Sequence, residues 1–198
     1  KEGTYHLPFI DDASVECSIA AAVVALYLGV TPEELDVRMS QLEPVAMRLE
    51  VKEGQHGCTL INDSYNSDIN SLDIALDFMS RRPDQEGKSR TLILSDIYQS
   101  GVTPHELYHR VMELAVKRGV TKFIGIGKEI KRILADEGGG QVAGDQTAKL
   151  HGTVAFFFED VDEFQRSEVF EGVRKEKVVI QGARDFGFDQ ITEMLEQK

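Results

Sequence analysis

The feature that most constrains the fold is an alternation, from residue 48 onward, of short apolar runs with longer amphipathic stretches. The apolar runs are typical of strands, and they lie at residues 48–52, 58–61, 91–95, 122–126, 153–158 and 177–181. Helical periodicity is found between them, near residues 70–81, 104–118, 128–135, 161–168 and 188–197. Strands that alternate with helices build βαβ units. The sequence therefore predicts an α/β fold with three layers, in which a mostly parallel, Rossmann-like sheet has helices on both faces.

The first two strand-like runs are separated by a short segment that contains Gly54 and Gly57. A connection this short suits an antiparallel hairpin, whereas parallel neighbours need a crossover of about a dozen residues or more. We therefore expect one edge of the sheet to be antiparallel.

Residues 1–45 have a different, helical character. The stretch at 13–29 is apolar on most faces of a helix, and Thr31 and Pro32 are the usual cap and first-turn residues of a second helix. A helix with so apolar a surface needs a partner. We therefore divide the chain into a short helical segment and an α/β domain that spans residues 46–198.

Composition and charge exclude one class of function. The chain has 198 residues, of which 41% are hydrophobic, and a net charge of −12. A protein that binds the backbone of nucleic acids needs a basic face, so we expect no nucleic-acid partner. A single nucleotide stays possible, because a few cations and a helix N-terminus suffice to bind its phosphates.

Cys17 and Cys58 lie in apolar surroundings without a CxxC spacing, which predicts buried, free thiols in a reducing compartment. The longest apolar run, residues 19–30, is too short to cross a bilayer, so we expect no membrane partner. A cytoplasmic protein is the resulting expectation. The sequence begins without methionine, and we expect it to be a piece of a longer chain.

Small polar residues crowd the end of the second predicted strand, in the segment NDSYNSD at 62–68. In open parallel sheets, ligands bind beyond the carboxyl ends of the strands. Asp63 there can accept both hydroxyl groups of a ribose, and Tyr65 or Asn66 can pack against a base. The alternative is a plain strand-to-helix turn in which Asn70 caps the next helix.

Two further strand ends carry polar residues. Ser95 and Asp96 follow the third predicted strand, where Asp96 is either a ligand or a helix cap. Gly182, Ala183 and Arg184 follow the last strand. A guanidinium next to an uncluttered backbone suits a carboxylate or a phosphate, and a solvated surface cation is the alternative.

Several familiar motifs are incomplete. The segment GIGKEI at 125–130 lacks the first Gly and the final Ser or Thr of a Walker A loop, and also the third Gly of the dinucleotide fingerprint. His105 and His109 have the helical spacing of zinc ligands, but no third ligand accompanies them. We therefore predict no metal ligands in this chain. Phe186 and Phe188 are expected in the core or at its rim.

Together, these segments resemble the C-terminal domain of the Mur ligase family, and in particular its MurF branch. The segment INDSYNSDINSL at 61–72 resembles the Asp-Asp-Ser-Tyr-Asn-Ala-Asn-Pro segment of that branch. The other matching segments are SIAAAVVALYLGVTPEEL (18–35), LEPVAMRLEV (42–51), GVTKFIGIGKE (119–129) and VVIQGARDF (178–186). Departures from the family pattern include Ala13-Ser14 in place of a His-Asn pair, Ile69 in place of Pro, and Ser95 and Gln99 in place of Gly and Glu.

The resemblance implies an ATP-dependent amide ligase that adds D-alanyl-D-alanine to UDP-N-acetylmuramoyl-tripeptide in peptidoglycan biosynthesis, with Mg²⁺. Residues 1–45 would be the helical tail of the central ATP-binding domain, and residues 46–198 the C-terminal domain that closes over the nucleotide. The P-loop and the Mg²⁺ ligands would lie in the remainder of the parent chain. The fragment alone is therefore expected to be inactive.

Roles follow by position in the family motifs. The residues that would face ATP are Arg48 at the phosphates, Asp63 at the ribose, and Tyr65 and Asn66 along the nucleotide. The residues that would face the incoming dipeptide or the peptide carboxylate are Gly182, Ala183 and Arg184. Some family members are fused to an alanine racemase, and the ending EMLEQK falls where such a domain would follow.

Two alternatives stay open. One is another ligase of the same superfamily, such as a different Mur enzyme or folylpolyglutamate synthase. The other is a non-catalytic module that binds a nucleotide or a protein partner, which the incomplete Walker A loop favours and the apolar helix at 13–29 disfavours.

Overall fold

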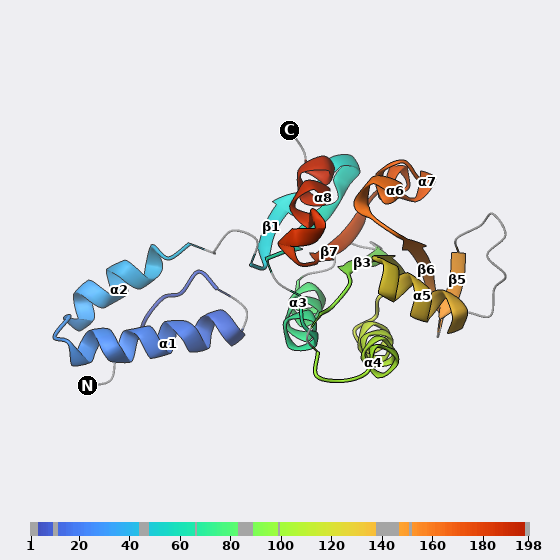
Figure 1. Cartoon of the computed structure of the whole chain (residues 1–198). Helices are drawn as coiled ribbons and strands as arrows, with labels where there is room; N and C mark the ends of the chain where they lie inside the picture. Colours follow the sequence, from blue (N-terminus) through green and yellow to red (C-terminus); the bar gives the residue numbers. More distant parts are fainter. Residues whose placement is uncertain are drawn as a thin grey trace. The chain divides into compact units, whose positions relative to one another are not determined.

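The computed structural model describes residues 4–9, 12–43, 48–65, 67–82, 89–98, 100–137, 147–150 and 152–196. For Ala13, residues 136–137 and 147–150, and Arg184, only the backbone is described. The chain divides into two units, Lys1–Val45 and Ala46–Lys198, whose helices and strands are labelled in Figure 1. Among the described helices, none is long and apolar enough to cross a membrane.

The first unit consists of helices α1 (Asp12–Tyr27) and α2 (Pro32–Ser40). Thr31 caps α2, since its hydroxyl accepts a hydrogen bond from the backbone N–H of Glu34, as the sequence predicted. The small core of this unit contains Ala22, Leu35 and Met39. Large apolar side chains of α1 are exposed, among them Val23 and Val24 at 61% and 57%. Cys17, which we expected to be buried, is exposed on this helix.

The second unit is built on a seven-stranded sheet in the order β1-β2-β7-β3-β4-β6-β5. In that order the strands are β1 (Glu50–Glu53), β2 (Thr59–Asp63), β7 (Glu176–Gln181), β3 (Ser89–Ser95), β4 (Lys122–Ile126), β6 (Thr153–Phe158) and β5 (Thr147–Leu150). The five central strands are parallel, and β1 and β5 pair antiparallel at the two edges. The predicted hairpin at the β1 edge is confirmed. The strand β5 was not predicted from the sequence.

Helices cover both faces of this sheet. They are α3 (Ile69–Arg81), α4 (Pro104–Lys117), α5 (Lys128–Glu137), α6 (Val161–Gln165), α7 (Glu168–Glu171) and α8 (Phe188–Leu195). One core cluster joins α3, α4 and α5 to one face of the sheet, and a second cluster joins α6, α7 and α8 to the other. Figure 1 shows α6, α7 and α8 above the strands and α3 and α4 below them. The predicted three-layer α/β architecture is therefore confirmed.

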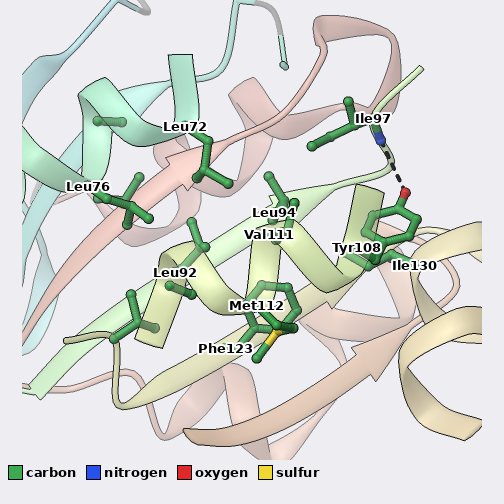
Figure 2. Packing of buried hydrophobic residues seen from close by; sticks show 14 of the residues in the cluster. Leu72, Leu76, Leu92, Leu94, Ile97, Tyr108, Val111, Met112, Phe123 and Ile130 are labelled. Atoms are coloured by element: carbon green, nitrogen blue, oxygen red, sulfur yellow. Dashed lines mark hydrogen bonds between the residues drawn. The ribbon is translucent and has the colours of Figure 1, made fainter. Parts of the chain in front are cut away.

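The strand residues alternate between the two clusters because successive side chains of a strand point to opposite faces. On β3, Leu92 and Leu94 pack with α3 and α4, whereas Ile93 packs on the opposite face. Figure 2 shows the first of these clusters. Tyr108 of α4 packs in it and also makes a hydrogen bond, since its hydroxyl accepts from the backbone N–H of Ile97 at 3.3 Å. That bond fixes the loop that leaves β3.

Two helical details differ from the sequence prediction. The pattern at 161–168 is divided into α6 and α7. Helix α6 ends at Gln165 with Arg166 as its C-cap, and Ser167 caps α7 by accepting a hydrogen bond from the backbone N–H of Phe170. The helix α3 is capped by Asp68 rather than by Asn70. Asp68 accepts hydrogen bonds from the backbone N–H groups of Asn70 and Ser71, each at 2.9 Å.

Candidate functional site

The sheet topology marks the place where a ligand would bind. Strand β7 lies between β2 and β3, although it comes last in the sequence. After β2 and after β3 the chain turns to helices on one face, α3 and α4, whereas after β7 it turns to α8 on the opposite face. Loops therefore diverge on both sides of β7. Such a topological switch point, beyond the carboxyl ends of the strands, is where open α/β sheets bind ligands.

At the first switch point, between β2 and β7, Asp63 and Gln181 end neighbouring strands and are partners in register. Asp63 is 4% exposed and Gln181 is fully buried. The Gln181 amide nitrogen, Nε2, donates to Asp63 Oδ2 at 3.3 Å and to Ser71 Oγ at 2.8 Å. A buried polar group is retained at low cost only when it has such partners. Here the two hydrogen bonds of Gln181 join β2 and β7 to the first turn of α3.

Burial raises the pKa of Asp63 to about 6. A backbone hydrogen bond from Leu49 and the positive charge of Arg48 act in the opposite direction, and the negative charge of Asp68 adds to the increase. Burial dominates because a carboxylate loses its hydration when it leaves water. The Asp63 carboxyl is therefore a group whose charge changes just below neutral pH.

Arg48 and Tyr65 lie at the same strand end and are exposed. The guanidinium carbon of Arg48 is 4.7 Å from the centre of the Tyr65 ring, the geometry of a cation–π contact. The Tyr65 side chain is 55% exposed. Three of the residues predicted to face a nucleotide, Arg48, Asp63 and Tyr65, are thus brought together. Asn66, the fourth, lies outside the described residues.

Most other polar side chains of this segment are turned inward. Asn62, Ser64 and Ser67 are at most 6% exposed, and the Ser64 hydroxyl donates to Asn62 Oδ1 at 2.6 Å. The crowding of polar residues in the segment thus has two parts. One part forms an internal hydrogen-bond network, and Tyr65 stands on its outer surface.

The second switch point lies between β7 and β3. The Ser95 hydroxyl accepts a hydrogen bond from the backbone N–H of Ala183 at 3.2 Å, which joins the loops that follow the two strands. Tyr98 and Phe186, one from each loop, form an aromatic pair with ring centroids 5.3 Å apart. Tyr98 is 61% exposed. An accessible aromatic surface therefore accompanies this switch point.

Gly182 and Arg184 were predicted to face a substrate. A Cβ atom on Gly182 would lie 2.3 Å from the ring of Phe188, so packing alone requires glycine there. Phe188 is fully buried in the second core cluster, as expected. Arg184 begins the short 3-10 helix η2 (Arg184–Phe186), and its side chain lies outside the described part of the chain.

Asp96 is a helix cap. It is 3% exposed, and its carboxylate accepts hydrogen bonds from the backbone N–H groups of Glu129 and Ile130 in the first turn of α5. The Tyr108 hydroxyl donates to it as well, at 3.1 Å. Because Asp96 occupies the N-terminus of α5, the segment GIGKEI has no room there for a phosphate. A Cβ on Gly127 would lie 2.4 Å from the Asp96 carboxyl carbon.

No group of three or more metal-ligating side chains occurs among the described residues. The Nδ1 atom of His109 lies 3.5 Å from Oε1 of Glu113, one turn further along α4.

Sequence reasoning missed Gln181 and Ser71, which hold Asp63 and α3 together. The available signal was a polar residue at the end of an apolar strand and a serine three residues after Asp68, the spacing of a reciprocal cap.

Comparison with known proteins gives consistent relatives. No protein-family model matches the chain. The UDP-N-acetylmuramoyl-tripeptide–D-alanyl-D-alanine ligase of Escherichia coli is 25% identical over 144 residues, which cover 73% of this chain and 31% of that protein. The enzyme of the same name from Bacillus subtilis is 29% identical over 109 residues, which cover 55% of this chain and 23% of that protein. The chain thus spans less than a third of the length of these relatives.

Solved structures of MurF ligases share the fold. A crystal structure of MurF from Acinetobacter baumannii matches 96% of this chain with a TM-score of 0.74 and 20% identity, over 39% of its own length. MurF from Thermotoga maritima, solved in complex with ADP, matches 94% with a TM-score of 0.68 and 16% identity, over 38% of its length. The chain is thus related in sequence to MurF ligases, and it has the fold of the C-terminal domain of the Mur ligase family.

Proposed function

We propose that the chain is the C-terminal part of an ATP-dependent ligase that adds D-alanyl-D-alanine to UDP-N-acetylmuramoyl-tripeptide. The names of its relatives support this reaction. In this proposal residues 1–45 are the tail of the central ATP-binding domain, and residues 46–198 are the C-terminal domain. The reaction supplies peptidoglycan, which maintains cell shape and permits division, and its nucleotide substrates place the parent enzyme in the cytoplasm.

The observation that carries the proposal is the gathering of Arg48, Asp63 and Tyr65 at the carboxyl end of β2. An exposed guanidinium suits the phosphates of ATP, because it forms charge-assisted hydrogen bonds with phosphate oxygens. The exposed Tyr65 ring suits the flat face of the nucleotide base, and Asn66, the next residue in the sequence, is proposed to line the nucleotide as well. Asp63, at the end of the same strand, is proposed to accept a hydrogen bond from a ribose hydroxyl.

The same residues would orient the nucleotide rather than perform chemistry on it. When the C-terminal domain lies over ATP held by the rest of the parent enzyme, these side chains exclude water from the phosphates. Mg²⁺, when bound, neutralises the charge of the transferred phosphoryl group. Its ligands would come mainly from the remainder of the parent chain, because the described residues provide no cluster of three ligands.

The dipeptide is proposed to lie at the second switch point, at Gly182, Ala183 and Arg184. Close packing of Gly182 on Phe188 and the bond from Ala183 to Ser95 fix the backbone of this loop. A fixed loop allows a guanidinium that follows it to bind the carboxylate of a dipeptide with defined geometry. The racemase domain suggested by the ending of the sequence stays a prediction.

The test is steady-state kinetics of the full-length parent ligase. Asp63→Ala should increase the KM for ATP by about tenfold, the loss expected for one good hydrogen-bonded contact, with a much smaller change for the dipeptide. Asp162→Ala, at an exposed aspartate of α6, is the matched control. An unchanged KM for ATP in Asp63→Ala removes the nucleotide assignment.

Two further assays separate the alternatives. The ligation rate of the parent enzyme with D-alanyl-D-alanine, compared with its rate with single amino acids such as glutamate, distinguishes this ligase from other enzymes of the superfamily. Residues 1–198 alone should neither ligate nor turn over ATP. Measurable ATP turnover by this chain would contradict its role as one part of the catalytic site.

A further inference from the structure

We propose that Gln181 is a positioning residue for nucleotide binding, because its side-chain amide holds both ends of the loop 64–67 that carries Tyr65. The inference rests on the proposed function, which assigns Tyr65 to the nucleotide. It adds a residue that contacts no ligand itself. Gln181 lies on β7, far in sequence from the loop that it holds.

The geometry of the amide is the first argument. The two hydrogen atoms of Gln181 Nε2 are directed at Asp63 Oδ2 and at Ser71 Oγ, at 3.3 Å and 2.8 Å. Asp63 is the last residue of β2, immediately before the loop, and Ser71 lies in the first turn of α3, just after it. One primary amide has two N–H donors. Both are therefore used, one at each end of the loop.

The bond to Ser71 extends to the cap of α3. The Ser71 hydroxyl lies 3.0 Å from Asp68 Oδ2, and it accepts a hydrogen bond from the Asp68 backbone N–H at 3.2 Å. Asp68 in turn accepts from the backbone N–H of Ser71. This reciprocal cap fixes the residue at which the loop becomes a helix. The amide of Gln181 therefore connects the cap of α3 to the end of β2.

Burial makes the amide difficult to replace. Gln181 is fully buried, so water cannot take over its two donated bonds when the amide is lost. Its oxygen, Oε1, has no hydrogen-bond partner in the described part of the chain. Among the described residues, the hydrogen bonds that orient the side chain are therefore those donated by its two N–H groups. Its effect on a ligand has to pass through the residues that it holds, Asp63 and the loop that carries Tyr65, since Gln181 itself is fully buried.

The charge of Asp63 provides a separate readout. A hydrogen bond donated to a carboxylate favours its charged form, so loss of the Gln181 donor should move the Asp63 pKa further above about 6. The other charged groups that act on Asp63 are Arg48, which lowers its pKa, and Asp68, which raises it. Neither of them is changed by a substitution at position 181. An Asp63 titration that does not change when the amide is removed would contradict the Gln181–Asp63 hydrogen bond on which the proposal rests.

The experiment uses the full-length parent ligase with Gln181→Met, which keeps the length of the side chain and removes the amide. We expect the KM for ATP to increase five- to tenfold at pH 7.5, while the KM for D-alanyl-D-alanine and kcat at saturating ATP change less than twofold. The acidic limb of the pH profile for kcat/KM of ATP should move to higher pH. Gln190→Met, at an exposed glutamine of α8, is the matched control and should leave all of these values unchanged.

A double-mutant cycle decides whether Gln181 acts through the loop. In a Tyr65→Ala background, Gln181→Met should raise the KM for ATP by a clearly smaller factor than in the original enzyme, because one of the ligand contacts that it supports is already absent. Equal effects in both backgrounds would overturn the proposal. If Gln181→Met fails to fold, as judged by its thermal transition, Ser71→Ala removes the partner at the other end. It should then raise the KM for ATP in the same way, and an unchanged KM would contradict the proposal.

The two levels of inference fail differently. If Tyr65→Ala leaves the KM for ATP unchanged, the proposed nucleotide contact is wrong. If Tyr65→Ala raises it and both Gln181→Met and Ser71→Ala do not, the nucleotide contact stands and only the positioning role is wrong.

Discussion

The two ends of the sheet both bury charged side chains, and they do so in opposite ways. At the amino end, Glu176 is 5% exposed, accepts a hydrogen bond from the Thr91 hydroxyl at 2.6 Å and pairs with Lys122. At the carboxyl end, Asp63 is equally buried, but its strongest donors are neutral groups, and its pKa is raised to about 6. The charge of Glu176 is thus balanced by a cation, whereas burial destabilises the charged form of Asp63.

This difference shows where the molecule gives up stability. A raised carboxyl pKa means that the charged form is less stable in the folded protein than in the unfolded chain. From the ordinary value of 3.8 to about 6, the difference corresponds to roughly 3 kcal/mol at neutral pH. Strained or destabilised groups are common at functional sites. The amino end therefore stabilises the fold, and the carboxyl end is where we propose that the ligand binds.

The largest expected effect on stability is at the amino end. Glu176→Ala should lower the free energy of unfolding by about 3 kcal/mol, because it leaves Lys122 and Thr91 without their partner in a buried position. Urea denaturation of residues 1–198 measures this change, with Glu193→Ala, at an exposed glutamate of α8, as control. A loss below about 1 kcal/mol, typical of a surface pair, would remove the contrast between the two ends.

The next effect is the pH dependence of stability at the carboxyl end. Between pH 3.8 and about 6, folded Asp63 retains a proton that the unfolded chain has lost, so the free energy of unfolding falls as pH increases. Asp63→Asn does not titrate. The stability of this variant relative to the original chain should therefore increase by about 2–3 kcal/mol from pH 4 to pH 7, measured by urea denaturation at each pH. A difference that is constant with pH would contradict the raised pKa.

The smallest effect concerns the exposed aromatic residue of the carboxyl end. Tyr65→Ala should cost less than about 1 kcal/mol of stability, since it removes an exposed cation–π contact with Arg48. Tyr65→Phe retains the ring and should be nearly neutral. A much larger loss in Tyr65→Ala, in the same denaturation assay, would mean that this side chain serves the core and not the surface.

The sequence was sufficient for the architecture because the apolar runs are the strands. The runs at 122–126 and 153–158 coincide with β4 and β6, and parallel strand ends necessarily meet at one edge. Arg48, Asp63 and Tyr65 lie together because the predicted hairpin pairs β1 antiparallel with β2, which places the start of β1 beside the end of β2. The strand β5 was missed because TAKL (147–150) is a short edge segment in which three of the four residues are good helix formers, and its pairing with β6 is decided by tertiary contacts.

Other features depended on contacts that sequence order does not contain. The position of β7 between β2 and β3 is set by packing of the whole sheet, so the Asp63–Gln181 pair could not be foreseen. Cys17 was expected inside because its helix is apolar, but an apolar helix is buried only where a partner surface exists. Asp68 and Asn70 are both good caps by composition, and the hydrogen bond from the Asp68 backbone N–H to the Ser71 hydroxyl shows which of them caps α3.

The way in which Asp96 is held has a consequence for the interpretation of mutational surveys. Its carboxylate is fully engaged by Tyr108 and by two backbone N–H groups of α5, so any replacement disturbs a helix that leaves the edge where a ligand is expected. A survey that ranks positions by lost turnover would score Asp96 beside residues that touch substrate. Normalising each rate to the amount of correctly folded enzyme would separate residues that contact substrate from residues that stabilise the fold, and would place Asp96 in the second class.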